Sequence, residues 1–139
     1  MIDLPIKRKY IATDNTKNCI DAKALENILI ALIAEYGGVE AYLEDVHGRG
    51  GWSASISFGL GETIGAIRSV IDMLDIGLTL ITPSIWKKHF KLTSDKEIVR
   101  AYANKAFPAA RPYLKRKKDH DRAEALLIAK YAVEMNRRN

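Results

Sequence analysis

Apolar residues recur every three or four positions in several stretches of the chain, and this spacing is typical of amphipathic helices. The predicted helices cover residues 22–35, residues 57–74, a short segment from Pro83, residues 94–107, and a final segment from about Asp119 to Met135. Asp21 stands at the capping position of the first helix, and Gly37-Gly38 is its stop signal. At residue 94, Ser-Asp-Lys-Glu has the spacing of a capping box.

Two other stretches have the patterns of strands. In residues 39–46 a period of two puts Tyr42, Glu44 and Val46 on one side of a strand and Leu43 and Asp45 on the other. Leu78 to Ile81 is a short continuous apolar run of the kind that buried parallel strands show. These predicted strands alternate with predicted helices along the chain. The expected fold class is therefore α/β, with a mainly parallel sheet flanked by helices.

Length and composition narrow the class of protein. A chain of 139 residues, 47% hydrophobic and 28% charged, predicts one domain that spans residues 1–139 and buries its own core. Cys19 is the only cysteine, which excludes an intrachain disulfide and indicates a reducing compartment. No apolar run approaches the roughly 18 residues of a membrane span. A cytoplasmic protein with no membrane partner is expected.

The distribution of positive charge points to a polyanion. The formal net charge is +5, with a pI near 9.3, and the lysines and arginines are clustered. Because the densest cluster directly precedes an acidic segment, we interpret it as a nucleic-acid contact rather than a solvated surface. The residues predicted to contact DNA phosphates are Lys87, Lys88, Lys115, Arg116, Lys117 and Lys118.

Acidic residues stand at the head of the last predicted helix. On a helical wheel, Asp121 lies near Glu124, and Glu124 opens the apolar stripe that Leu127 and Ile128 continue. Both carboxylates are therefore expected to face inward. Asp119 has two interpretations of equal weight: it caps the helix, or it takes part in catalysis. His120 also lies within roughly 60° of Glu124 on the same wheel, and which of Asp119, His120 and Asp121 would bind a metal stays open.

Glu44 supplies an acid from a different part of the chain. It stands near the carboxyl end of the predicted strand 39–46, and sites in parallel α/β sheets assemble at that edge. If the last helix packs across the sheet, Glu44 converges with Asp121 and Glu124 into the oxygen-rich ligand set that Mg²⁺ or Mn²⁺ prefers. Bound there, two such ions would activate water for phosphodiester hydrolysis.

Several short motifs occur in an order that resembles the phage and bacterial branch of RuvC-like Holliday junction resolvases, members of the RNase H-like superfamily. The motifs are Asp3-Leu4-Pro5, Glu44-Asp45-Val46-His47, Gly50-Gly51 followed by Ser57-Phe58-Gly59, Pro83-Ser84-Ile85-Trp86-Lys87-Lys88, Phe107-Pro108, and Lys118-Asp119-His120-Asp121-Arg122-Ala123-Glu124-Ala125. They run through most of the sequence. Each motif is weakly specific, whereas their order and spacing together are fairly specific.

The resemblance implies an RNase H-like fold and a homodimeric, Mg²⁺-dependent endonuclease that cuts four-way junctions or other branched DNA in recombination and repair. It implies catalytic roles for Glu44, Asp119, Asp121 and Glu124. His47 stands where relatives place an aromatic that wedges into the junction. Arg49 and Trp52 lie in the same loop; Arg49 is a predicted DNA contact, and Trp52 either stacks on bases or packs on the protein.

The chain departs from the family at its start. The family opens with a strand of the type Ile-Gly-Ile-Asp-Pro-Gly, whose Asp is the first metal ligand, and Asp3 matches a non-catalytic position instead. Three interpretations stay open: a truncated product, a remnant that pairs with another subunit, or a member that binds DNA without cutting it. A dimer or larger assembly is expected. A small-molecule α/β enzyme is the least favoured class, because no glycine-rich phosphate motif follows a strand.

Overall fold

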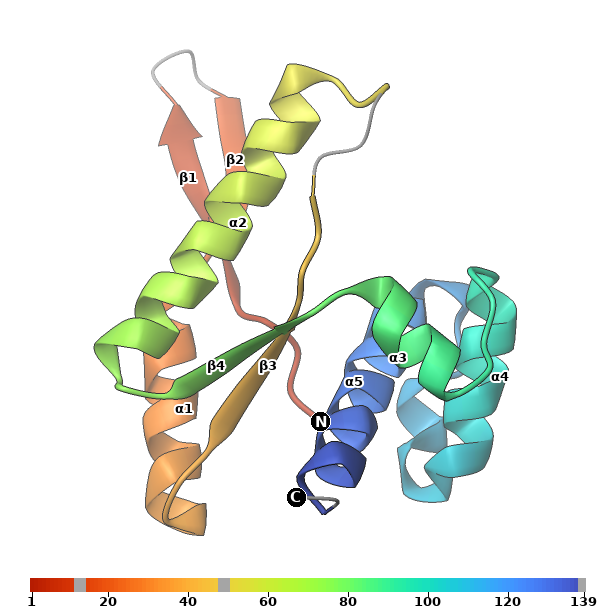
Figure 1. Cartoon of the computed structure of the whole chain (residues 1–139). Helices are drawn as coiled ribbons and strands as arrows, with labels where there is room; N and C mark the ends of the chain where they lie inside the picture. The colour runs from red at the N-terminus through yellow and green to blue at the C-terminus, as the bar shows by residue number, and fades with distance from the viewer. Residues whose placement is uncertain (12–14, 48–50, 138–139) are drawn as a thin grey trace. The chain divides into compact units, whose positions relative to one another are not determined.

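A computed structural model describes residues 1–11, 15–47 and 51–137 of the chain. The described part is mixed α/β and contains these elements (Figure 1): β1 (Ile6–Ile11), β2 (Asn15–Ile20), α1 (Ala22–Tyr36), β3 (Glu40–Glu44), α2 (Ala54–Met73), β4 (Gly77–Ile81), α3 (Pro83–His89), α4 (Lys96–Ala106), the 3₁₀ turns η1 (Pro108–Tyr113) and η2 (Lys117–Asp119), and α5 (His120–Asn136). Each helix and strand predicted from the sequence is present, with ends shifted by a few residues.

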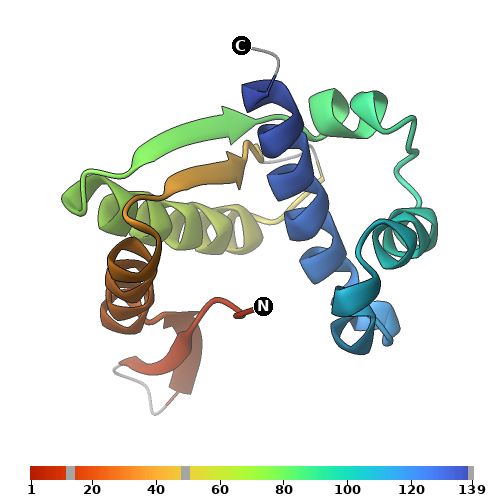
Figure 2. The ribbon, with the colours of Figure 1, turned by 90° about the horizontal axis from the view of Figure 1, so that it is seen from below.

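The strands form two separate two-stranded sheets. In Figure 2, β3 and β4 run in the same direction, as the α/β pattern predicted. The other sheet, β1 with β2, is an antiparallel hairpin in which Ile6 lies opposite Ile20. The hairpin was not predicted. The structure therefore confirms the mixed α/β class and one parallel pair, but the described strands do not form a mainly parallel sheet.

The chain divides into two compact units, and the unit boundaries fall within β3 and β4. The helical unit contains Met1, Tyr42–Val46 and Thr79–Asn139, and the hairpin unit contains Ile2–Ala41 and His47–Leu78. The core of the helical unit lies between α3, α4 and α5. Its largest fully buried side chains are Trp86, Leu114, Leu127 and Val99. Trp86 anchors the short helix α3 in this core.

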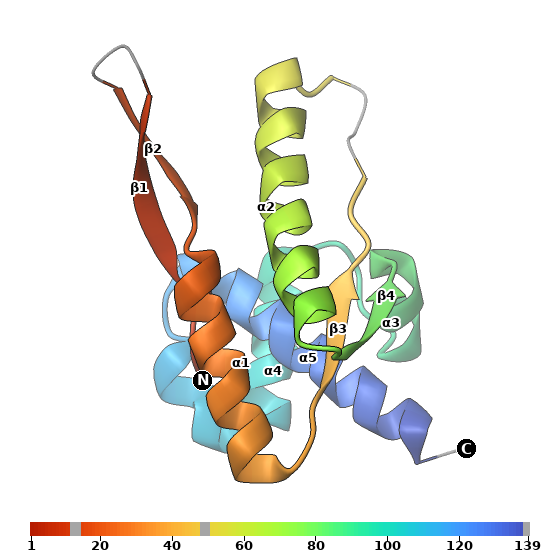
Figure 3. The same ribbon diagram turned by 90° about the vertical axis from the view of Figure 1, so that its left-hand side faces the viewer.

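The hairpin unit has its own smaller core. Figure 3 shows the β1–β2 hairpin leading into α1, with α2 beside them. The buried apolar side chains of this unit are Leu25, Ile67, Val70, Ile71 and Ile76. Lys17 on β2 donates to Glu62 on α2 at 2.6 Å, which ties the hairpin to the helix. Large apolar side chains also remain on its surface, including Ile6 at 65% exposure and Phe58 at 69%.

Local capping explains where the helices begin and end. The Asp21 carboxylate accepts a hydrogen bond from the Ala24 amide, and Gly37 ends α1 with a left-handed φ of 76°, as the sequence predicted. At α4 the predicted capping box is wrong. Asp95, not Ser94, is the cap, because its Oδ1 accepts from the Glu97 and Ile98 amides.

No helix in the described ranges is long and apolar enough to cross a membrane.

Candidate functional site

Glu44 lies at the carboxyl end of β3, where the sequence placed it. Its Oε1 accepts a hydrogen bond from the indole nitrogen of Trp86, 3.1 Å away on α3. The indole is fully buried and Glu44 is half-buried. Trp86 therefore fixes the direction of this carboxylate, because a buried indole N–H is a donor that needs an acceptor.

Glu124 lies on the first turns of α5 and is held by the next residue of α3. The Lys87 Nζ is 3.1 Å from Glu124 Oε1, and the two side chains are only 20% and 19% exposed. The same ammonium lies 5.0 Å from the centre of the Trp86 ring. The prediction that Glu124 avoids solvent is confirmed. Lys87, a predicted phosphate contact, is instead bound by a half-buried carboxylate in this structure.

Glu44 and Glu124 therefore contact two successive residues of one short helix, α3. The contacts of both acids use Oε1, so within the described part of the chain each Oε2 has no hydrogen-bond or ion-pair partner. A carboxylate oxygen without a partner can still accept from water or bind a cation. We call Glu44 and Glu124, together with the Trp86 and Lys87 side chains that bind them, the acid pair.

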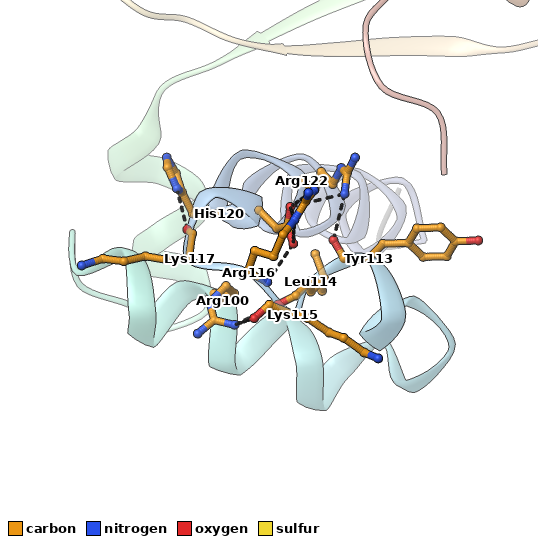
Figure 4. A network of polar contacts seen from close by, with 9 residues as sticks. Arg100, Tyr113, Leu114, Lys115, Arg116, Lys117, His120 and Arg122 are labelled. Atoms are coloured by element: carbon orange, nitrogen blue, oxygen red, sulfur yellow. Dashed lines mark hydrogen bonds and ion pairs between the residues drawn. The ribbon is translucent and has the colours of Figure 1, made fainter.

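Asp119 is buried, and its carboxylate is bound by two arginines. The residue is 4% exposed, and its carboxylate accepts hydrogen bonds from the Arg116 amide at 2.8 Å, the Arg116 guanidinium and Arg122. Figure 4 shows this network. The hydrogen bonds from Arg116 are the main cause that lowers the pKa of Asp119 to about 2. Asp119 is the N-cap residue of α5, as one interpretation predicted, but its side chain makes no capping hydrogen bond to that helix.

Asp121, in the first turn of α5, has its side chain in solvent. Its side chain is 82% exposed, and Oδ1 lies 2.9 Å from the Nε2 atom of His120. The inward direction predicted from the helical wheel is wrong for this residue. Asp121 and Glu124 both lie within α5, but Asp121 stands in its first turn, where the side chain is left in solvent.

The basic residues 115–118 before α5 have two different roles: one is bound to a carboxylate, and the others are exposed. Arg116 is committed to Asp119, whereas Lys115, Lys117 and Lys118 are exposed, as is Lys88 on α3. Arg100 on α4, which the sequence did not single out, donates to the carbonyl oxygens of Leu114 and Lys115 and so fixes the backbone of the run (Figure 4).

The predicted junction-contacting loop belongs to the hairpin unit. His47 is exposed and Trp52 is 39% exposed. Arg49 lies outside the described residues. The DNA contacts predicted for these residues remain predictions.

The described residues contain no group of three or more histidines, cysteines or acids placed to hold a metal ion. The predicted trio is thus reduced to Glu44 and Glu124, because Asp121 is in solvent. Comparisons of the chain with models of known protein families and with curated proteins gave no match.

Proposed function

We propose that the chain is a metal-dependent endonuclease that hydrolyses phosphodiester bonds in branched DNA, of the RuvC-like, RNase H-like kind that its motifs resemble. The observation that carries the proposal is the acid pair: Glu44 and Glu124, 80 positions apart in the sequence, contact the neighbouring residues Trp86 and Lys87.

The residues of the acid pair fit a hard cation such as Mg²⁺ or Mn²⁺. Glu124 already binds one cationic group, the Lys87 ammonium, and each acid retains an oxygen without a partner among the described residues. Carboxylate oxygens are the ligands that these ions prefer, and waters complete the shell where protein ligands are few. Glu44 and Glu124 would hold the ion, which when bound supplies an activated water and neutralises phosphate charge.

The side chains around the acid pair have separable roles in this proposal. Trp86 is a positioning residue, because it orients Glu44 without reaching solvent itself. Lys87 balances the charge of Glu124 when DNA is absent and can turn to a phosphate when DNA is present. The exposed lysines at 88, 115, 117 and 118 supply affinity for the DNA backbone without reading its sequence.

A homodimer is part of the proposal. Within the described residues each strand has a single strand neighbour, which leaves one edge of every strand open to pairing. Ile2, Leu4 and Ile6, at or beside the start of β1, are at least half exposed. A second copy of the chain would cover such a surface. Light scattering that gives a strict monomer at micromolar concentration would contradict this part.

The cleavage test uses a synthetic four-way junction with Mg²⁺ or Mn²⁺. Purified protein is expected to nick the junction, and Glu44→Gln is expected to remove cleavage while leaving binding intact. Glu40→Gln is the matched control, because Glu40 is the exposed glutamate at the other end of the same strand. Equal cleavage by wild type and Glu44→Gln would refute the proposed site.

A second candidate function is junction binding without hydrolysis. It is favoured by the ion pair between Lys87 and Glu124 and by the exposure of Asp121, which leave only two acids together among the described residues. Junction binding with no cleavage in either metal would support this candidate and refute the nuclease.

A further inference from the structure

A shallow cavity of about 550 Å³ lies in the helical unit, away from the contacts of the acid pair. It is formed by the start of α4 and by the segment that leads into α5. Its lining residues are Asp95, Lys96, Glu97, Lys117, Lys118 and His120. We call it the lysine pocket. Figure 4 shows Lys117 and His120, which line one side of it.

The two acids of the lysine pocket are already engaged. Asp95 accepts hydrogen bonds from the Glu97 and Ile98 amides as the cap of α4, and Glu97 is paired with Arg100. By contrast, within the described part of the chain the ammonium groups of Lys117 and Lys118 have no hydrogen-bond or ion-pair partner. Lys117 is near enough to Glu97 to help lower the pKa of that carboxyl, after the larger effect of Arg100. The three lysines of the pocket still outnumber its two acids.

His120 joins the two sides of the lysine pocket. Its Nδ1 lies 3.1 Å from the Lys117 carbonyl oxygen, and its Nε2 lies 2.6 Å from the Lys96 Nζ. A lysine ammonium can only donate and a carboxylate can only accept, and Asp121 Oδ1 lies 2.9 Å from the same Nε2. In the neutral imidazole Nε2 therefore accepts from Lys96, and in the protonated imidazole it donates to Asp121, whose side chain is 82% exposed. In the neutral form His120 holds the Lys96 ammonium at the pocket that Lys117 and Lys118 also line.

We propose that the lysine pocket binds a phosphate group of the DNA backbone. That the phosphate belongs to DNA rests on the proposed function. That the pocket binds an anion rests on its lysines alone. Three lysines around one cavity match the charge and the several acceptor oxygens of a phosphodiester. The positive end of the α5 dipole, which no side chain caps, adds to the attraction. The phosphate replaces His120 as the acceptor for Lys96.

One arm of the test measures junction binding in EDTA over a range of salt concentrations, using fluorescence anisotropy of a labelled four-way junction. Each phosphate contact contributes about 0.9 to the slope of log K against log salt. Lys96→Gln is expected to lower that slope by about one. Lys105→Gln is the matched control, because it removes the same exposed charge from the last turn of the same helix, and its slope is expected to equal that of wild type.

The other arm needs no DNA. The imidazole NMR signals of His120 are followed as inorganic phosphate replaces chloride at constant ionic strength, in wild type and in Lys96→Gln. Saturable shifts in wild type that Lys96→Gln abolishes are expected. A circular dichroism spectrum identical to that of wild type confirms that Lys96→Gln folds.

The outcomes separate the lysine pocket from the nuclease. Equal slopes for Lys96→Gln and Lys105→Gln overturn the proposal even if Glu44→Gln abolishes cleavage, and His120 signals unmoved by phosphate overturn it as well. Phosphate shifts without a slope change also overturn it, since the anion would then not be the DNA backbone. A slope change specific to Lys96 supports the proposal even where no metal gives cleavage, and in that case only the nuclease fails.

Discussion

Replacing Trp86 with phenylalanine tests how firmly the acid pair is built into the core. The change removes the 3.1 Å hydrogen bond to Glu44 and shrinks a side chain that is fully buried. A hydrogen bond to a charged group contributes about 1.5–3 kcal/mol. The smaller ring also leaves a cavity that costs about 1 kcal/mol more. The expected loss in the free energy of unfolding is therefore about 3 kcal/mol.

Urea unfolding followed by far-ultraviolet circular dichroism measures this loss. With a slope of about 2 kcal/mol per molar urea, the midpoint should fall by about 1.5 M. Glu44→Gln retains an amide oxygen that can accept from Trp86, so it should cost no more than about 1 kcal/mol. In the double variant the two effects should fail to add by about 1 kcal/mol, since the residues are in contact.

The result that refutes the reasoning is specific. A Trp86→Phe loss below about 1 kcal/mol, or strictly additive effects in the double variant, would mean that the contact between Trp86 and Glu44 does not stabilise the fold. The proposal that Trp86 positions the Glu44 carboxylate would then be wrong.

Three further predictions concern stability. The pKa of Asp119 is lowered from its ordinary 3.8 to about 2, so its stabilising effect is complete above about pH 4 and is lost as the pH falls through 2; acid titrations should show a shallower loss for Asp119→Asn. Leu127→Ala, at a fully buried site, should cost about 3 kcal/mol in urea, whereas Val133→Ala, at 51% exposure on the same helix, should change stability by less than about 0.5 kcal/mol. Gly37→Ala should cost about 1 kcal/mol, because φ is 76° there; an unchanged melting temperature would contradict this.

The helices could be predicted because their signals are local. Asp21 and Gly37 bound α1 through contacts within one turn, and the apolar period of α5 places Leu127 in the core. No strand was predicted in the β1–β2 hairpin. The β-branched Ile6, Thr16 and Ile20 in two six-residue stretches were the available signal for strands.

For the candidate site, the sequence predicted which acids take part but not which side chains they contact. Glu44 and Glu124 could be selected by type and position, but the contacts of Trp86 and Lys87 depend on the packing of α3 against other elements, which no local pattern encodes. The spacing Arg116, Asp119, Arg122 was a readable signal, because residues three apart on a helical turn contact one another. Interpreting Arg116 only as a DNA contact concealed it.

The buried indole of Trp86 has a practical consequence as an optical probe. The chain has two tryptophans, and the other, Trp52, is 39% exposed in the hairpin unit. Acrylamide should therefore quench the red-shifted emission of Trp52 and spare the blue-shifted emission of Trp86. Because the Trp86 N–H donates to Glu44, the residual emission reports on that carboxylate directly. A titration with Mn²⁺ can be followed in unlabelled protein, in an ordinary fluorimeter, before any DNA is added.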